Sequence, residues 1–480
     1  MFMKKPFYIT TTLPYVNAEL HMGHALEFVR ADVIARYKKL TGFDVFFNSG
    51  TDEHGSKIWK KAKEEGKDVQ DFVNENVEKF YESVKLFGVS DDINFIRTSD
   101  PHHTKAAQEF WKRVNSNGFI YKKNYQTKYC SGCESEKTDS ELSDGKCTEH
   151  PNLEIEFIDE ENYFFKYSEF SSKLLDFYKQ NPDFIIPEFR FNEVKAFVER
   201  GLQDFSISRL KEKMPWGIEV PGDENHVMYV WFDALTNYIA NVGFPDDTEK
   251  FEKYWVNGTP TQYCGKDNTR FQGAMWQAML MAADLPNSKR IVVNGHITGD
   301  GGVKMSKSLG NTVDPKKIAE EYSTDALRYF LIKEVSSFED SPFTIERFKD
   351  AYNAGLANGL GNLASRILTL SEKYLETCPE ITENNLPQEF FDHLEKYEIQ
   401  KASDFVWKKI QELDERIQKD EPFKVVKVDL DKGKQIISEI VVDLYVVSEM
   451  LEPLLPETSK YLKEQIKLNQ KPEKPLFLRV

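Results

Sequence analysis

The first part of the chain changes repeatedly between strand-like and helix-like hydrophobic patterns. Residues 7–13 (FYITTTL) and 44–50 (DVFFNSG) are rich in β-branched and aromatic residues, which predicts strands. Between them, residues 21–40 carry apolar side chains at helical spacing, and residues 57–66 and 69–87 predict two further helices. This order indicates βαβ units and a parallel sheet, a pattern that stops near residue 118.

The sheet pattern is interrupted and then resumes. Residues 134–161 are rich in Asp and Glu and contain few large apolar residues. Buried parallel strands, by contrast, are nearly continuous apolar runs. This stretch is therefore predicted to be an insertion. Strand and helix patterns then return in the order 227–232 (strand), 233–241 (helix), 262–265 (strand), 269–283 (helix) and 290–296 (strand).

Long helical periods dominate beyond residue 345, over about 345–375, 389–419 and 430–451. We therefore expect an α/β protein: a parallel-sheet, Rossmann-like domain split by an insertion and followed by a C-terminal α-helical bundle. The expected boundaries are 1–117 and 229–297 for the two halves of the Rossmann-like domain, 118–228 for the insertion, 298–344 for a connecting region, and 345–480 for the bundle with its C-terminal tail.

Composition narrows the class of protein. The 480 residues include 63 Lys+Arg and 79 Asp+Glu, a formal net charge of −16, so bulk charge does not favour a nucleic-acid coat. No run of about 18 apolar residues suggests a membrane span, and the N-terminus turns polar too soon for a secretory signal. We expect a cytoplasmic protein without membrane contact. Five cysteines, an odd number, favour free or metal-bound thiols over a disulfide framework.

The first candidate site is His21-Met22-Gly23-His24, which opens the predicted helix 21–40. A helix N-terminus presents unpaired N–H groups and partial positive charge, which suit phosphate. The two histidines are three residues apart and share a helix face, while Gly23 lets a flat base approach the backbone. Two surface histidines at a helix start are the alternative interpretation.

The second candidate is Lys304-Met305-Ser306-Lys307-Ser308, with glycines on both sides. Two lysines in such a loop could fold over a triphosphate and neutralise the charge that develops in phosphoryl chemistry. An exposed basic turn is the alternative, but the ordered pairing with the histidine motif across a split α/β domain favours a nucleotide site.

Cys130-x-x-Cys133 and Cys147-x-x-His150 have the spacing of a tetrahedral zinc knuckle. The surrounding stretch has few residues with which to build a core, so metal ligation would supply its order. A redox Cys-x-x-Cys pair or unrelated cysteines stay open as alternatives. Cys264 and Cys378 have no such pattern and are expected to be structural thiols.

Taken together, these motifs resemble those of class I aminoacyl-tRNA synthetases, and within that class the methionyl-tRNA synthetase family. The resemblance covers essentially the whole chain, through TTLPYVNAELHMGHA, SGTDEHG, VMYVWFDALTNYI, YCGKDNTRF, KMSKSLGN and GLGNLASR. It implies that L-methionine reacts with ATP, accompanied by Mg²⁺, to give methionyl-adenylate and pyrophosphate. It also implies transfer of methionine to the 3′-terminal ribose of tRNA(Met), and one structural Zn²⁺ in the insertion. Residues 298–344 would then form the KMSKS loop and a region that contacts the tRNA stem.

The resemblance further implies roles for individual residues. The catalytic residues would be His21, His24, Lys304 and Lys307, with Lys307 the most important for rate. ATP would be bound by His21, Gly23, His24, Glu27, Gly265, Asp267, His296, Met305 and Lys307. Methionine would be bound by Leu13, Tyr15, Asp52, Trp231, Ala234, Leu235, Tyr238 and Gln272, with Asp52 on the ammonium group. The zinc ligands would be Cys130, Cys133, Cys147 and His150, and the anticodon would be read by Asn362, Arg366 and Phe423.

The sequence departs from the family pattern at three positions. Asn268 and Gln272 stand where most relatives carry an apolar residue and a histidine, and an amide does not titrate as an imidazole does. Phe423 stands where relatives usually carry a tryptophan, so a smaller ring would stack on the base.

Three other functions fit these motifs less well. Synthetases for valine, isoleucine or leucine normally carry a large editing insertion, for which residues 118–228 leave too little room. A nucleotidyltransferase with the HxGH motif would not need the KMSKS motif or the bundle, and a non-catalytic RNA-binding relative would not need His21, His24, Lys304 and Lys307. Because the chain stops at the end of the bundle, without the domain that dimerises some relatives, we expect a monomer.

Overall fold

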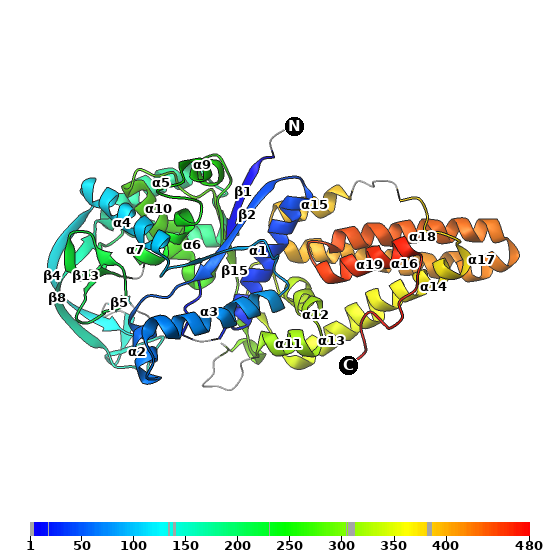
Figure 1. Cartoon of the computed structure of the whole chain (residues 1–480), viewed down its shortest axis with the longest axis horizontal. Coiled ribbons are helices and arrows are strands. Elements are labelled where there is room, and N and C mark those ends of the chain that lie inside the picture. Colours follow the sequence, from blue (N-terminus) through cyan, green and yellow to red (C-terminus); the bar gives the residue numbers. More distant parts are fainter. Residues whose placement is uncertain are drawn as a thin grey trace.

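A six-stranded parallel sheet forms the centre of one half of the molecule (Figure 1). The computed structural model describes residues 4–17, 19–132, 135–137, 141–229, 231–303, 305, 313–381 and 386–480. The strand order is β3-β2-β1-β14-β15-β9, and every neighbouring pair runs parallel. The strands are β1 (Pro6–Thr10), β2 (Asp44–Thr51), β3 (Asn94–Arg97), β9 (Ile185–Ile186), β14 (Thr261–Gly265) and β15 (Arg290–Asn294). The predicted Rossmann-like sheet is confirmed.

Helices cover both faces of this sheet, so its strands are buried on both sides. One apolar core joins one face of the sheet to α1 (Met22–Leu40) and α3 (Val69–Leu86) and continues into the C-terminal bundle. A second core joins the other face to α4 (Pro101–Ser116), α5 (Ser171–Gln180), α6 (Glu188–Glu199) and α10 (Trp276–Ala282). The shorter helices of this half are α2 (Ser56–Glu64), α7 (Trp231–Ala234), α8 (Asn237–Ala240) and α9 (Thr248–Phe251).

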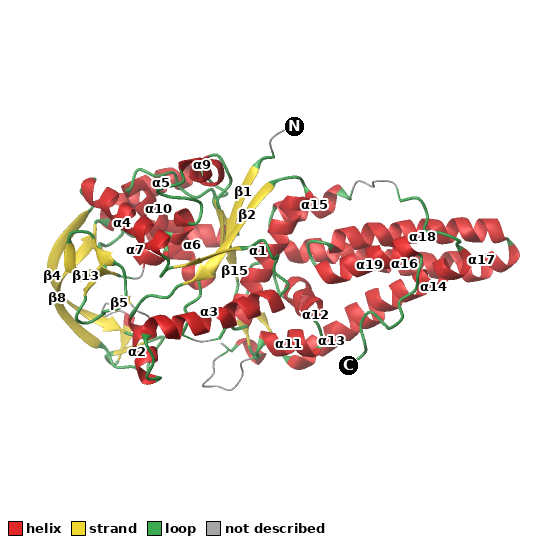
Figure 2. Cartoon of the chain, viewed as in Figure 1, coloured by secondary structure: helices red, strands yellow, loops and turns green. Residues whose placement is uncertain are grey.

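The described residues of the segment between the two halves of the sheet form a two-stranded hairpin and two larger antiparallel sheets. The larger has the order β10-β8-β4-β5 and is built on a long ribbon of β4 (Ile120–Cys130) and β8 (Glu156–Phe165), at the left in Figure 2. Its short strands are β5 (Ser135–Lys137) and β10 (Phe205–Ser206), and β6 (Leu142–Ser143) pairs with β7 (Lys146–Cys147) in a separate hairpin. The same segment also supplies β9, which pairs with β15 and forms one edge of the central sheet.

The strand predicted at 227–232 is wrong in both extent and partner. Strand β13 (Asp223–Met228) ends before the aromatic residues and pairs antiparallel with β11 (Ser208–Leu210) and β12 (Glu219–Val220), outside the parallel sheet. Trp231 begins helix α7 instead, and Phe232 is fully buried. A short apolar run has the same appearance in a buried strand and at the start of a buried helix, so periodicity alone could not separate them.

The C-terminal region is the predicted helical bundle. It comprises α13 (Ile345–Ala351), a π-helical segment (Tyr352–Gly361), α14 (Asn362–Tyr374), α15 (Gln388–Glu395), α16 (Ile399–Asp420), α17 (Pro422–Val428), α18 (Leu430–Leu451) and α19 (Pro456–Leu468). The single helix predicted over 389–419 is divided between α15 and α16, because Tyr397 adopts a positive φ of 60°. Before the bundle lie β16 (Ile297–Thr298), α11 (Pro315–Glu321), α12 (Thr324–Tyr329) and β17 (Ser341–Pro342).

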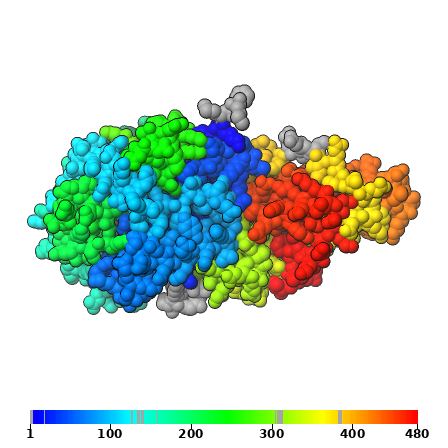
Figure 3. Space-filling model, viewed as in Figure 1, coloured from blue at the N-terminus to red at the C-terminus, as the bar shows by residue number. Residues whose placement is uncertain are grey.

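Helix α1 is fixed to the bundle by buried charges. The Asp32 carboxylate lies 2.9 Å from the Arg328 guanidinium, and both side chains are fully buried. Arg328 Nε also donates to the carbonyl of Leu454, at the corner between α18 and α19. Burial of an ion pair is costly unless both groups are satisfied, as they are here. The helix that opens with His21 and His24 is thus held against the bundle, which forms the elongated lobe at the right of Figure 3.

The described helices include none with both the length and the apolar character needed to cross a membrane.

Candidate active site

The predicted nucleotide and amino-acid residues come together at the carboxyl ends of the parallel strands. His21 and His24 follow β1, Asp52 follows β2, Gly265 ends β14 and His296 follows β15. In open parallel sheets, ligands bind beyond these strand ends, where loops and helix N-termini converge. The fold therefore places residues from four sequence segments at the same edge of the sheet.

His21 and His24 cap the N-terminus of α1 reciprocally. His21 Nδ1 accepts hydrogen bonds from the backbone N–H groups of Gly23 (3.1 Å) and His24 (3.4 Å), and His24 Nδ1 accepts from the His21 N–H (3.2 Å). The rings stack with centroids 3.7 Å apart. Because each Nδ1 accepts a hydrogen bond, the proton of each neutral ring lies on Nε2, where it can be donated to an anion.

Burial lowers the pKa of His24 well below its ordinary value, and the neighbouring His21 charge lowers it further. His24 is therefore neutral near pH 7 and acts as a hydrogen-bond donor rather than a cation. The positive potential for a phosphate then comes from the N-terminus of the 19-residue helix α1.

Gly23 is needed for a reason other than the predicted approach of a base. A Cβ atom at this position would lie 3.0 Å from Cε1 of His21, closer than ordinary van der Waals contact. Any side chain here would therefore require the His21 ring to shift by a few tenths of an ångström. The glycine preserves the stacked histidine pair.

Glu27 lies one turn below the histidines and joins two strand ends. Its Oε1 accepts hydrogen bonds from the Thr12 backbone N–H (2.7 Å) and hydroxyl (2.5 Å). Burial raises the pKa of Glu27 to about 7, although hydrogen bonds from Thr12 and from the backbone of Gly265 oppose the shift. Glu27 consequently changes charge near neutral pH.

Asp267 and His296 form the second part of the nucleotide site. The His296 ring lies 3.0 Å from the Asp267 carboxylate, which is 70% exposed. A Cβ built at the neighbouring Gly265 meets nothing within 4 Å, so the end of β14 borders open space. The Asp340 carboxylate accepts from the backbone N–H of His296 (2.9 Å) and pairs with Lys266 (2.6 Å). An exposed carboxylate beside an imidazole suits hydroxyl groups such as those of a ribose.

The lysine loop falls mainly outside the described residues. Lys304 and Lys307 both lie there, so their predicted roles are untested by this geometry. Met305 is described and packs against the core that includes α1.

Tyr15 and Asp52 are paired by the backbone. The loop after β1 forms a parallel bridge with the end of β2, in which Asp52 N–H donates to the Pro14 carbonyl (3.0 Å) and Val16 N–H to the Asp52 carbonyl (3.3 Å). Asp52 is only 6% exposed. Two predicted methionine-binding residues, 37 positions apart, are thus neighbours in space.

Four further residues predicted to bind methionine lie on the segment that follows β13: Trp231, Ala234, Leu235 and Tyr238. Trp231 stacks on Phe271 with ring centroids 3.9 Å apart and an angle of 18° between the planes. Ala234, Leu235 and Tyr238 are at most 8% exposed. Leu13 packs against the core that contains Leu235 and Tyr238. These apolar and aromatic walls suit a polarisable thioether.

Gln272, the amide at the position that departs from the family pattern, is 2% exposed and donates to the Tyr238 hydroxyl. Its side-chain oxygen accepts a hydrogen bond from Gln262. Gln272 and Tyr238 were both predicted to bind methionine, and this contact makes them neighbours. Gln262 was not among the predicted residues.

A cluster of two histidines and an aspartate was also missed. His54 Nδ1 lies 2.7 Å from one oxygen of Asp233, and His103 Nε2 lies 2.8 Å from the other. Burial alone would raise the pKa of Asp233, but the charge of His54 and the hydrogen bonds from both histidines lower it to about 2. Asp233 therefore stays ionised and ties the loop after Asp52 to α7, which begins with Trp231. Asp233 stands inside the VMYVWFDALTNYI motif, the only sequence signal for it.

Three of the four predicted zinc ligands converge. The ligand atoms of Cys130, Cys147 and His150 all lie within 4.8 Å of one another, and both cysteines are buried. Cys133 lies outside the described residues. Two thiolates and an imidazole at this separation fit the ligand set of a tetrahedral zinc ion. Lys57 of α2 donates to the carbonyl of Gly132 (3.0 Å), which joins this knuckle to the Rossmann-like half.

The predicted anticodon residues lie on the bundle. Asn362 is exposed at the first position of α14, and Arg366 follows one turn later, where it forms an ion pair with Asp414 of α16. Phe423, on α17, is 39% exposed. Both α14 and α17 pack against α18. Exposed aromatic and guanidinium planes suit the stacking of single-stranded bases.

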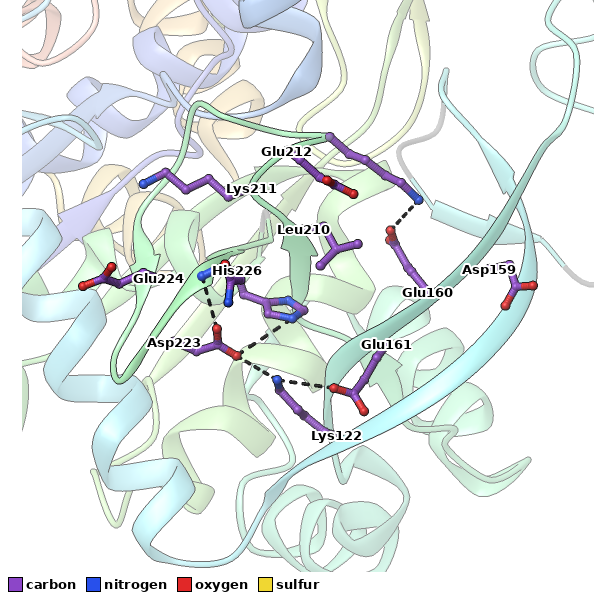
Figure 4. Close-up of a pocket in the computed structure, with 12 residues that line it drawn as sticks. Lys122, Asp159, Glu160, Glu161, Leu210, Lys211, Glu212, Asp223, Glu224 and His226 are labelled. Carbon is purple, nitrogen blue, oxygen red and sulfur yellow. Dashed lines mark hydrogen bonds and ion pairs between the residues drawn. The ribbon is translucent and has the colours of Figure 1, made fainter.

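A cavity of about 760 Å³ lies in the inserted segment, apart from these residues (Figure 4). Its walls carry charges of both signs that pair with each other, such as Lys122 with Asp223 (2.7 Å) and Lys213 with Glu160 (2.9 Å). None of the predicted site residues lines it. Six carboxylates and three lysines line it, and this excess of negative charge disfavours a triphosphate, so the cavity is not a second candidate for the nucleotide.

Comparison with known proteins agrees with this geometry. The family model described as tRNA synthetases class I (M) matches residues 7–153 and 132–368. The methionine--tRNA ligase of Caldanaerobacter subterraneus subsp. tengcongensis is 40% identical over 98% of this chain and 75% of the relative. That of Thermotoga maritima is 36% identical over 98% of this chain and 76% of the relative.

A similar solved structure is that of Mycobacterium tuberculosis methionyl-tRNA synthetase in complex with methionyl-adenylate. It superposes with a TM-score of 0.91 at 34% identity, covering 99% of this chain and all of that chain.

Proposed function

The chain belongs to the methionyl-tRNA synthetases of class I, and from this premise we propose how its residues share the two steps of the reaction. It activates L-methionine with ATP to give methionyl-adenylate and pyrophosphate, and then transfers methionine to the 3′-terminal ribose of tRNA(Met). In the first step a methionine carboxylate oxygen attacks the α-phosphorus and pyrophosphate leaves. Catalysis then depends on positioning and on stabilising negative charge.

The observation that carries the nucleotide assignment is the reciprocal cap of α1. His21 and His24 would direct their Nε2–H groups at phosphate oxygens at the positive end of the helix. Gly23 keeps the two rings in place, and Glu27 holds the strand ends beneath them. Lys304 and Lys307, with Met305 between them, would cover the phosphates from the opposite side and stabilise the departing pyrophosphate.

The nucleoside part of ATP would lie over the open end of β14. Gly265 provides space there, and Asp267 with its neighbour His296 would contact the ribose hydroxyl groups. Mg²⁺, bound with the triphosphate, would spread the same negative charge.

Methionine would bind between the loop at Tyr15 and helices α7 and α8. The Asp52 carboxylate would hold the ammonium group, since it is buried and adjacent to Tyr15. The thioether would contact Leu13, Trp231, Ala234, Leu235, Tyr238 and Gln272.

Zn²⁺ would be held by Cys130, Cys133, Cys147 and His150 as a structural ion that orders the tip of the β4–β8 ribbon. Asn362, Arg366 and Phe423 would read the anticodon of tRNA(Met) through edge hydrogen bonds and stacking.

We also propose that the protein works as a cytoplasmic monomer. Its largest exposed apolar side chains are distributed over many elements, from Leu40 on α1 to Leu468 on α19, rather than gathered in one broad patch among the described residues. Light scattering at micromolar concentration should give about 56 kDa, close to the 55.8 kDa of the chain, and a dimer mass would overturn this assignment.

Methionine-dependent exchange of pyrophosphate into ATP tests the first step, and charging of tRNA(Met) tests the second. Lys307→Ala should lower the exchange rate at least about 100-fold while leaving the methionine Kd within about twofold, because the proposed role of the lysine is to stabilise the departing pyrophosphate. Lys289→Ala, a lysine that precedes β15 and has no assigned role, serves as the control. A wild-type exchange rate in Lys307→Ala would refute the role of Lys307.

A further inference from the structure

The guanidinium group of Arg30 is buried on α1 without a carboxylate partner. Arg30 is 1% exposed, and Tyr263 is the one titratable group of the described chain whose charge influences it. Burial lowers the pKa of Arg30 to about 10, so the side chain is still positively charged at pH 7. A buried charge is costly unless an opposite charge and hydrogen bonds compensate it.

Neutral oxygen atoms satisfy two of the three guanidinium nitrogens. Nη1 donates to Asn294 Oδ1 (3.1 Å) and to the carbonyl of Ser337 (2.9 Å). Nη2 donates to three carbonyls near the end of the π-helical segment Phe330–Glu334, those of Leu331 (3.3 Å), Val335 (2.9 Å) and Ser336 (2.8 Å). These dipoles favour a cation but carry no net charge. Nε has no hydrogen-bond partner within the part of the chain that the structure describes.

Asn294 and Tyr263 contribute two further donors of the same kind. Asn294 Oδ1 accepts from Arg30, which can only donate, so the orientation of the amide is fixed and Nδ2 is its second polar atom. Among the described residues, neither Asn294 Nδ2 nor the Tyr263 hydroxyl has a hydrogen-bond partner, and the two side chains are at most 3% exposed. Burial raises the pKa of Tyr263 well above its usual range, so its hydroxyl keeps its proton and can donate.

The sheet brings these donors to one face. Tyr263 on β14 pairs with Val292 on β15, and Asn294 lies two residues further along β15. Residues two apart in a strand point to the same face, which here is the face that shares a core with α1. Arg30 and Tyr263 are close enough that each affects the pKa of the other. The three donors therefore gather where α1 packs on β14 and β15.

The chemistry of this cluster favours a small anion. All three groups donate, so their common partner must accept. A water oxygen offers two lone pairs to three donors and brings no charge. A halide ion accepts from all three and also neutralises the buried guanidinium. An oxyanion such as sulfate has four oxygens, which need more donors than these three.

We propose that Arg30 Nε, Asn294 Nδ2 and the Tyr263 hydroxyl together bind one halide ion, such as chloride. The ion is structural: it compensates the charge of Arg30 and fixes α1 against β14 and β15. Because the three groups come from distant parts of the sequence, the folded protein binds the ion and the unfolded chain does not. The inference is independent of the proposed function.

The location connects the ion to the proposed nucleotide site. Helix α1 begins at the histidine pair of His21 and His24, β14 ends at Gly265, and His296 follows β15. The same three elements thus hold the ion on one side of the sheet and carry the proposed ATP-binding residues at its carboxyl edge.

Thermal denaturation of the wild type tests the binding directly. A ligand that binds only the folded state stabilises it by mass action, so Tm should rise by about 2 °C or more when about 0.2 M gluconate is replaced by chloride at equal ionic strength. Equal Tm values in the two salts would overturn the proposal.

Crystals grown in bromide test the position. Anomalous scattering at the bromine edge should give a peak within hydrogen-bond distance of Arg30 Nε, Asn294 Nδ2 and the Tyr263 hydroxyl. Density there without an anomalous signal would mean an ordered water only, and would overturn the proposal.

Two variants assign the stabilising effect to this cluster. Asn294→Asp places a carboxylate beside Arg30 in place of the anion, so the exchange of gluconate for chloride should shift its Tm by less than about 0.5 °C. Tyr263→Phe loses one of the three donors, and the half-saturating chloride concentration should rise at least about tenfold.

Tyr167→Phe is the matched control. Tyr167 is 4% exposed and its hydroxyl also has no hydrogen-bond partner among the described residues, but it packs in the second core, on the other face of the sheet. Its chloride response should equal that of the wild type. A full chloride response in Asn294→Asp would show that the salt acts elsewhere and would refute the site, and the wild-type measurements stand if a variant folds poorly.

Discussion

His54 and Asp233 are joined by a hydrogen bond of 2.7 Å, although 179 residues separate them. The bond connects the loop that carries Asp52 to the helix that begins with Trp231. His103 approaches the same carboxylate from α4, at 2.8 Å. One buried carboxylate therefore positions the two segments that we propose bind the ammonium and thioether ends of methionine.

Replacing this carboxylate should affect methionine more than ATP. Asp233→Asn loses the ionic part of both contacts, so we expect the methionine KM to rise about tenfold, with the ATP KM unchanged and a clear loss of thermal stability. Steady-state pyrophosphate exchange and thermal denaturation measure the two effects. His102→Gln, at the exposed histidine next to His103 on α4, is the control. Equal changes in the KM values for methionine and ATP would contradict the positioning role.

Glu27 should make stability depend on pH near neutrality. Its pKa is about 7 in the folded protein, above the ordinary value of 4.5, so folding favours the protonated form. This contribution is present in full below about pH 4.5 and is lost as the pH rises to about 7. Glu27→Gln, which mimics the neutral form, should be more stable than the wild type at pH 8, by at most about 3 kcal/mol, and the difference should fall below about 1 kcal/mol at pH 5.

Thermal denaturation from pH 5 to 8 measures the difference. The exposed Glu78→Gln on α3 controls for the general loss of one negative charge. A stability difference between wild type and Glu27→Gln that stays constant with pH would show that Glu27 does not titrate in this range.

Zinc removal should disorder the knuckle without abolishing adenylate formation. Cys147→Ser removes one of the converging ligands, so the bound zinc should fall from about one ion per chain to nearly none. Amide exchange in the β6–β7 hairpin should become faster, while methionine-dependent pyrophosphate exchange stays within about threefold of the wild type, because the proposed catalytic residues lie outside the knuckle. Cys378→Ser, at a thiol in the bundle, should retain the metal. Full zinc content in Cys147→Ser would exclude Cys147 as a ligand.

The bundle prediction separates recognition of tRNA from activation of methionine. Arg366→Ala should lower kcat/KM for tRNA(Met) charging about 10- to 100-fold and leave pyrophosphate exchange unchanged, since the guanidinium lies on α14 and not at the strand ends. Arg416→Ala is the matched control, because Arg416 pairs with Asp443 and Glu439 on the neighbouring helix and has no predicted contact with a base. Equal losses in both variants would indicate a general electrostatic effect on tRNA binding.

Much of the site was predictable because its motifs are short and their chemistry is local. The histidine pair requires only a helix start after a strand, and both features are visible in residues 7–24. The zinc spacing similarly brought Cys130, Cys147 and His150 together as expected. Less predictable was the run from Val227 to Phe232, whose apolar residues suit either a buried strand or a buried helix.

The sequence by itself determined the parallel α/β pattern, the motifs at the strand ends, the metal-ligand spacing and the family. Each of these features depends on residues that are close together in the sequence. Their periodicity and spacing can therefore be recognised without the structure. Only the tertiary structure decided that His54 and His103 share Asp233, that β9 completes the sheet, and that Gln277 on α10 donates to the backbone carbonyl of Gln272. These contacts join distant segments, and their geometry follows from packing the whole core, which no local pattern encodes.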